Sequence, residues 1–96
     1  MVRYLEFDKV IVHRLRDGEK IPTAIEELLE RENVHSGLVF GIGGLKYVKV
    51  GVFNNIKKEY EVKEFKSENG KIIELVSLMG NIALKDGKPS THIHVT

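Results

Sequence analysis

The sequence predicts a small α+β protein in which one helix packs on an antiparallel β-sheet. A single segment, residues 22–33, has apolar side chains at helical spacing. Much of the remaining chain alternates apolar and polar residues with a period of two, and turn-forming dipeptides such as Asp17-Gly18 and Asp86-Gly87 separate these segments. The chain has 96 residues, of which 42% are hydrophobic, so one core and one domain over residues 1–96 are expected.

The strands follow from this alternation. Residues 3–15 are expected to be extended, because Val10, Ile11 and Val12 precede the turn at Asp17-Gly18. Residues 60–65 form a charged alternating strand suited to a sheet edge. The strands after the helix are expected over residues 38–42, 47–53, 60–65, 72–84 and 91–96.

The helix is expected to begin with a capping box, since Thr23 and Glu26 have the required spacing. Ile25, Leu28 and Leu29 fall on one stripe of this helix, and the opposite side carries charged residues. The stripe should therefore pack on the sheet.

The strand over residues 72–84 is apolar on both faces if its period of two is unbroken. One face would then carry Ile72, Val76, Leu78, Ile82 and Leu84, and the other Ile73, Leu75, Met79 and Ala83. Gly80-Asn81 interrupts the pattern as a bulge or a bend would. Because one helix covers only one face of a sheet, the second face is expected to be a subunit interface.

Composition excludes several classes of function. The net charge is +1, which provides no general electrostatic footprint for nucleic acid or an anionic membrane. The chain has no cysteine, so a metal site would have to use His, Asp or Glu. The first 15 residues carry charges throughout and lack the apolar run of a signal peptide or membrane span, so a cytoplasmic protein is expected.

The candidate metal ligands are His92 and His94, which project from the same face if residues 91–96 form a strand. Two imidazoles can reach one zinc or other divalent ion, but a catalytic zinc site usually has three protein ligands. Glu74 is the best candidate for a third ligand. Alternation would bury it, and it would then need a metal, hydrogen-bond donors, a proton or an ion pair with Arg14. Structural or surface histidines remain the alternative to a metal site.

The glycine-rich segment over residues 41–44 resembles a phosphate-binding loop, yet that function requires a helix directly after the glycines. A β pattern follows instead. Gly41 and Gly43 are therefore interpreted as residues of a tight turn or of close backbone packing.

The order of these motifs resembles the plant and prokaryote conserved domain (PPC) family over nearly the whole chain. The matching segments are VHRLRDGE at residues 12–19, SGLVFGIGGLKYVKVGVF at 36–53, ELVSLMGNIAL at 74–84 and DGKPSTHIHV at 86–95. The resemblance implies an α+β domain with an antiparallel sheet that assembles as a trimer. It also implies structural or interface roles, which fall on Arg14, Gly41, Gly43, Ser77, Gly80 and Asn81.

Two departures from the family pattern limit what the resemblance implies. The plant members of the family contact DNA through AT-hook segments with an Arg-Gly-Arg-Pro core, and this sequence contains no such core. Nucleic-acid binding by this chain therefore rests on family analogy alone. Relatives continue after the HxH pair into strands that include a Gly-Gly-His, whereas this chain ends at Thr96. The expectation is a C-terminally short domain with an open sheet edge and an HxH pair that lacks a ligand.

The sequence favours a non-enzymatic, homo-oligomeric scaffold for assembly or interaction, with a trimer as the expected oligomer and regulation as a further option. The alternative is a metal-dependent enzyme or small-molecule binder that uses the HxH pair. A third hypothesis is DNA binding through an assembled surface, which the net charge of +1 disfavours.

Overall fold

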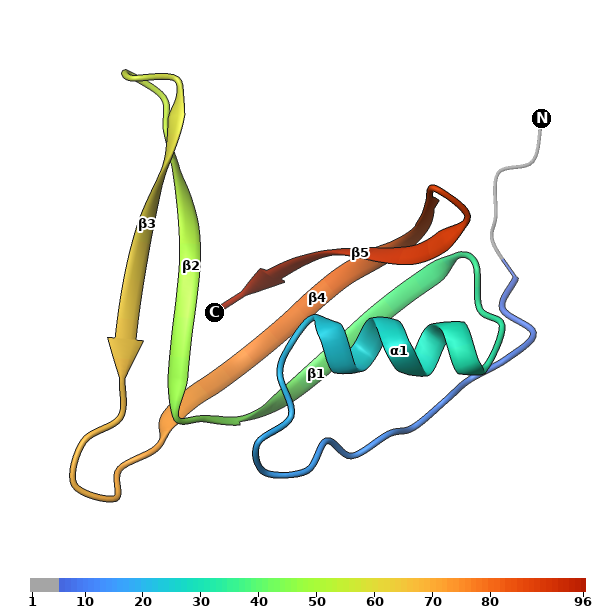
Figure 1. Ribbon diagram of the computed structural model, residues 1–96, viewed down its shortest axis with the longest axis horizontal. Helices are drawn as coiled ribbons and strands as arrows, with labels where there is room; N and C mark the ends of the chain where they lie inside the picture. Colours follow the sequence, from blue (N-terminus) through green and yellow to red (C-terminus); the bar gives the residue numbers. More distant parts are fainter. Residues whose placement is uncertain (1–5) are drawn as a thin grey trace. The chain divides into compact units, whose positions relative to one another are not determined.

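The computed structural model describes residues 6–96, which contain one helix and five strands (Figure 1). The elements are α1 (Thr23–Arg31), β1 (Gly37–Leu45), β2 (Tyr47–Asn54), β3 (Glu59–Lys66), β4 (Ile73–Lys85) and β5 (Lys88–Val95). One sheet has the strand order β1-β4-β5, and the other consists of β2 and β3. The predicted α+β class with antiparallel strands and one main helix is confirmed.

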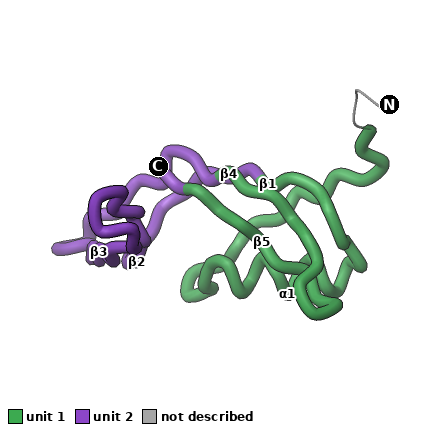
Figure 2. Tube along the Cα trace, turned by 90° about the horizontal axis from the view of Figure 1, so that it is seen from above, with its two compact units in different colours: residues 1–39, 79–94 green, residues 40–78, 95–96 purple. Residues whose placement is uncertain are grey.

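The chain divides into two compact units (Figure 2). The first comprises residues 1–39 and 79–94, and the second residues 40–78 and 95–96. Strands β1, β4 and β5 contribute residues to both units. The expectation of a single domain over residues 1–96 stays a prediction.

Helix α1 buries one side in the first unit, where Leu29 and Ile82 form the buried core. The helix ends at Arg31 with Glu32 as its C-cap, the following Asn33 has a left-handed φ of 56°, and the Val34 N–H donates to the Leu29 carbonyl at 2.8 Å. The predicted capping box is wrong, because Pro22 is the N-cap and makes no side-chain cap. The Glu26 carboxylate instead accepts hydrogen bonds from strand β5.

The second unit has Leu75 and Leu78 as its buried residues and contains the β2–β3 hairpin. The hairpin is antiparallel and pairs without interruption from Tyr47 opposite Lys66 to Asn54 opposite Glu59. Cross-strand neighbours Phe53 and Tyr60 pack edge to face, with ring centroids 5.2 Å apart. The predicted strands over residues 47–53 and 60–65 are therefore confirmed.

Strand β4 contains a β-bulge, but not at Gly80-Asn81 as the sequence suggested. The N–H groups of Val76 and Ser77 both donate to the Thr96 carbonyl, at 2.9 and 3.4 Å, and the Thr96 N–H donates back to Ser77 at 2.9 Å. Two residues of β4 thus face one residue of the neighbouring chain segment, which is the pattern of a bulge.

The bulge shifts the alternation of β4 by one residue. Before it, the better-covered side chains are those of residues 73, 75 and 77, and after it those of residues 78, 80 and 82. The expected pair of unbroken faces is therefore wrong. Leu78 and Ile82 are buried as expected, whereas Val76 and Glu74 point to the exposed side.

The leading strand expected over residues 3–15 is absent from residues 6–15, and residues 3–5 lie outside the described part of the chain. This segment contacts α1 through Lys9, whose Nζ donates to the carbonyl of Glu32 at 3.2 Å and lies 3.4 Å from its carboxylate. Among residues 6–96, no helix has the length and hydropathy needed to cross a membrane.

Candidate functional site

The HxH pair lies on the exposed side of β5. Thr91 and Ile93 are half-buried, while His92 and His94 alternate with them and are exposed. The two imidazole rings lie close together, with centroids 4.9 Å apart and planes at 70°. The two rings therefore share one face of the strand, as the spacing predicts.

The position of β5 in the first unit depends on a contact with α1. One oxygen of the Glu26 carboxylate accepts hydrogen bonds from the Thr91 N–H at 2.8 Å and from the Thr91 hydroxyl at 3.0 Å. Because Thr91 points toward the helix, its neighbours His92 and His94 point away from it. No local pattern in the sequence indicates this contact, since its partners are 65 residues apart.

Gly80 permits close packing between β4 and β5 beside the histidines. A Cβ atom at this position would collide with the carbonyl oxygen of His92 and would lie 3.0 Å from a side-chain carbon of Ile93. This contact gives a physical reason for the structural role expected of Gly80, which stays a prediction. The adjacent Asn81 is exposed.

Glu74 is exposed, and the expectation of its burial is wrong. The cause is the bulge at Val76 and Ser77, which moves Leu78 and Ile82 to the face of Leu75 and leaves the face that Glu74 shares with Val76 exposed. Arg14 is exposed as well. Neither charge therefore requires a buried counter-ion.

A complete metal-ligand set is not formed by the described residues, among which no group of three or more His, Asp or Glu side chains is placed to hold an ion. His92 and His94 thus provide two neighbouring imidazoles. The third ligand expected from Glu74 stays a prediction.

Residues 41–44 lie within strand β1, so the glycines there do not form the tight turn that the sequence suggested as one interpretation. A Cβ on Gly41 would touch the Leu78 side chain at 3.7 Å, and one on Gly44 would approach Ile72 at 2.5 Å, whereas Gly43 faces open space. Strand β2 follows these glycines, so the helix N-terminus that a phosphate-binding loop requires is not there.

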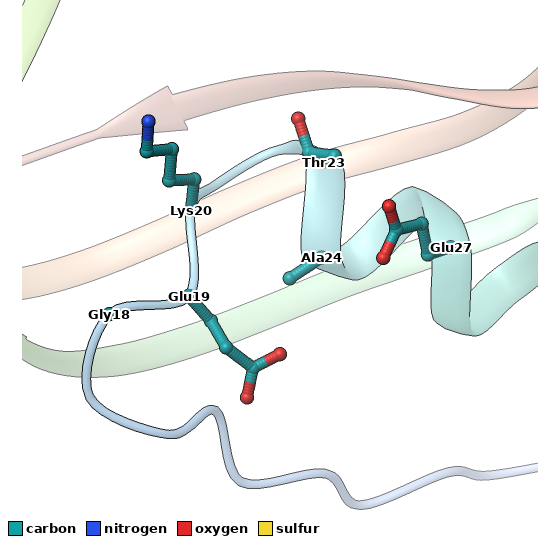
Figure 3. A pocket seen from close by; sticks show the side chains of 6 residues that line it. All are labelled: Gly18, Glu19, Lys20, Thr23, Ala24 and Glu27. Atoms are coloured by element: carbon teal, nitrogen blue, oxygen red, sulfur yellow. The ribbon is translucent and has the colours of Figure 1, made fainter.

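A shallow pocket lies at the start of α1 (Figure 3). Glu19, Lys20 and Glu27 contribute its charged side chains. The Glu19 carboxylate accepts a hydrogen bond from the Arg16 N–H at 2.7 Å and so serves the turn before the helix. The pocket brings together none of the site residues expected from the sequence.

The family model of the Plants and Prokaryotes Conserved (PCC) domain matches residues 2–96. The chain belongs to this family. Three solved PCC-like structures have the same fold. A plant- and prokaryote-conserved protein of Pyrococcus horikoshii is 35% identical with a TM-score of 0.73, and the match covers 95% of this chain and 64% of that one.

A metal-containing protein of Archaeoglobus fulgidus is 32% identical with a TM-score of 0.74, over 95% of this chain and 66% of that one. A candidate DNA-binding protein of Bacteroides thetaiotaomicron is 28% identical with a TM-score of 0.68, over 79% of this chain and 50% of that one. This PCC chain thus spans between 50% and 66% of the length of these structures. Among curated proteins, none matches it.

Proposed function

We propose that this PCC domain is a non-enzymatic scaffold that assembles with copies of itself, as a trimer, through the exposed apolar side chains of strand β1. The observation that carries the proposal is the row of large apolar side chains exposed along β1. Assembly would bury this row, and the remaining surface of the oligomer would be free to bind a partner.

The direction of the β1 side chains follows from its glycines. A Cβ on Gly37 would lie 3.6 Å from Ile82, and one on Gly41 would lie 3.7 Å from Leu78, so these positions face the buried residues. The alternate positions of β1 therefore point the other way. These positions carry Leu38, Phe40 and Ile42, all of which are exposed.

Strand β4 adds two residues of the same character. Val76 before the bulge and Met79 after it are both exposed large apolar side chains. Large apolar side chains exposed on ordered strands are typical of protein–protein interfaces. The trimeric state is the one that the family resemblance implies.

Two matched substitutions test this proposal. Ile42 on β1 is 84% exposed, and Ile56 in the turn between β2 and β3 is 94% exposed. Replacing either by Lys exchanges an exposed apolar side chain for a charge, but only Ile42→Lys places that charge in the proposed interface. Sedimentation should show a trimer for the unmodified protein and for Ile56→Lys, and monomer for Ile42→Lys.

Circular dichroism would establish that each variant keeps its secondary structure. A monomer for the unmodified protein at tens of micromolar would contradict the proposal. So would an Ile42→Lys variant that sediments like the unmodified protein.

The second candidate function is metal binding by His92 and His94. Its support is the 4.9 Å separation of the two exposed rings, together with the similarity to the metal-containing protein of Archaeoglobus fulgidus. Two imidazoles fit the donor chemistry of zinc, which would polarise a substrate or activate a water molecule once bound. The set is incomplete in the described residues, so a further ligand would be needed.

Elemental analysis of untagged protein tests the metal hypothesis. Stoichiometric zinc that is lost in the double variant His92→Ala/His94→Ala would support it. The control is His35→Ala, because the His35 ring hydrogen-bonds locally to Asn33 at 3.0 Å and lies outside strand β5. Equal zinc content in all three proteins would contradict binding by the HxH pair.

DNA binding is the third candidate function, supported by the similarity to the candidate DNA-binding protein of Bacteroides thetaiotaomicron. The net charge of +1 predicts weak binding at most, since phosphate neutralisation supplies most non-specific affinity. We expect no mobility shift with duplex DNA at micromolar protein and physiological salt. A clear shift under these conditions would favour DNA binding over the scaffold alone.

A further inference from the structure

The segment over residues 9–16 has the side-chain pattern of a strand but lies outside both sheets. Val10 and Val12 are 84% and 95% exposed, whereas Ile11 is 36% exposed and Leu15 is half-buried. One set of alternate positions is thus partly covered by the first unit, and the other set faces solvent. β-branched residues such as Val and Ile favour strands.

The backbone of this segment also has no sheet partner in the described part of the chain. Backbone N–H and C=O groups pair readily with the open edge of a sheet, and the row of main-chain hydrogen bonds supplies affinity for the added strand. Residues 9–16 are therefore suited to join a sheet edge.

Charge distinguishes among the available edges. Residues 9–16 carry Lys9, Arg14 and Arg16 and no carboxylate. The edge strand β1 is uncharged, and the edge strand β5 contains Lys and His but no acid. Strand β3 carries Glu59, Glu61 and Glu64, and within the described residues its one sheet neighbour is β2.

We propose that residues 9–16 of one copy add to the outer edge of β3 of a second copy, as a third antiparallel strand of its β2–β3 sheet. In the proposed register Arg16 lies opposite Glu59 and Arg14 opposite Glu61. Val12 then lies opposite Lys63. The solvent-facing set of the segment meets the β3 face that carries both glutamates.

The complementarity is lost in a register shifted by one residue and in a parallel strand, and the proposed register sets Lys9 opposite Lys66 at the end of β3. A shift by one residue turns the arginines toward the β3 face that carries Tyr60 and Val62, because side chains alternate between faces. A parallel strand with Arg14 opposite Glu61 would place Arg16 opposite Lys63. Like charges directly opposite each other destabilise a strand pair.

A second copy supplies the added strand because, in the described part of a single chain, neither residues 9–16 nor the outer edge of β3 has a strand partner. The β2–β3 sheet has two strands in the described chain, and residues 9–16 belong to neither sheet. Each copy can both donate the segment and accept one. The inference rests on the proposed self-assembly, but it uses a surface other than the apolar residues of β1.

A third strand would also stabilise the hairpin. Two-stranded hairpins are marginally stable in water, and three strands are usually needed for independent stability. No residue of the hairpin is among the buried apolar residues of the described chain, which are Leu29, Leu75, Leu78 and Ile82.

Cysteine cross-linking tests the inference directly, because the chain has no native cysteine. Protein with Val12→Cys is mixed with protein carrying Lys63→Cys, and each variant alone is the first control. The mixture should form an intermolecular disulfide, since residues directly opposite in antiparallel strands are close enough for one. The second control is a mixture of Val12→Cys with Ile56→Cys, in the hairpin turn, which should give little product.

A charge exchange then tests the register. Adding Arg16→Glu to the Val12→Cys protein should lower the yield of cross-linked product several-fold. Adding Glu59→Arg to the Lys63→Cys partner should restore the yield, because the pair is then reversed in sign. These two side chains suit the exchange, since within residues 6–96 neither makes a side-chain hydrogen bond or ion pair.

The outcomes separate this inference from the proposed function. Equal yields from the Lys63 and Ile56 mixtures, or no product at all, would overturn it. An internal disulfide in a chain carrying both Val12→Cys and Lys63→Cys, without product from the mixture, would also overturn exchange between copies. A trimer that Ile42→Lys dissociates would leave the proposed function standing in either case.

Discussion

The contact between Glu26 and Thr91 should contribute measurably to the stability of this PCC domain. Replacing Glu26 by Ala removes acceptors for two hydrogen bonds of 2.8 and 3.0 Å and leaves the Thr91 N–H without a partner. Hydrogen bonds to charged groups contribute roughly 1.5–3 kcal/mol each, and this site is only partly buried, so the lower value applies. We expect Glu26→Ala to lower the free energy of unfolding by about 3 kcal/mol.

A double-mutant cycle with Thr91→Val separates the two bonds. This substitution removes the hydroxyl and keeps the backbone N–H, so we expect a loss of about 1.5 kcal/mol. In the double variant the losses should be less than additive by about 1.5 kcal/mol, because both single changes break the hydroxyl bond. Urea unfolding followed by far-ultraviolet circular dichroism measures each value, at one protein concentration because assembly affects apparent stability.

The neighbouring Glu27 provides the matched control. It lies on the same helix and is exposed, so Glu27→Ala should change the free energy of unfolding by less than about 0.5 kcal/mol. If Glu26→Ala and Glu27→Ala have the same midpoint in urea, the contact with β5 does not stabilise the fold. Additive losses in the cycle would likewise show that Glu26 and Thr91 act independently.

Three further predictions concern strand β4. Gly80→Ala should lower the free energy of unfolding in urea by about 3 kcal/mol, because the added Cβ meets a backbone carbonyl of β5. Gly43→Ala is the control and should not lower it, since nothing lies within 4 Å of the added Cβ. Leu78→Ala should lower the free energy of unfolding by about 3 kcal/mol and Leu84→Ala by much less, because these side chains are 3% and 49% exposed. Equal losses for the two variants would contradict the assigned core. Glu74→Gln should leave the thermal midpoint unchanged, and a loss of several degrees would show that this carboxylate has a partner.

Local patterns predicted the regular elements well. The stripe of Ile25, Leu28 and Leu29 gave the helix, although it is shorter than residues 22–33. The strands around the β2–β3 hairpin were predicted because the alternation there is unbroken. The HxH spacing correctly indicated two rings on one face of β5.

Contacts between distant segments were beyond the reach of local patterns. Glu26 has the spacing of a capping box, but its actual partner is Thr91, and no local rule connects them. Residues 6–15 have strand-forming side chains, yet a strand exists only where an edge is available to pair with it. The burial of Glu74 was predicted wrongly because the bulge that shifts the alternation of β4 depends on hydrogen bonds to the distant Thr96, which no local pattern indicates.

The bulge in β4 also determines where this part of the chain can tolerate changes in length. Deleting one residue at Val76 or Ser77 would leave Leu75 and Leu78 two residues apart, so a regular strand without the bulge would still place both side chains on the buried face. A deletion near the turn at Asn69-Gly70 would change only a connection. Homologous chains should therefore vary in length at the turn and by the one extra residue of the bulge. They should keep a constant residue count between Leu78 and Ile82, where one deletion would turn a buried side chain toward solvent.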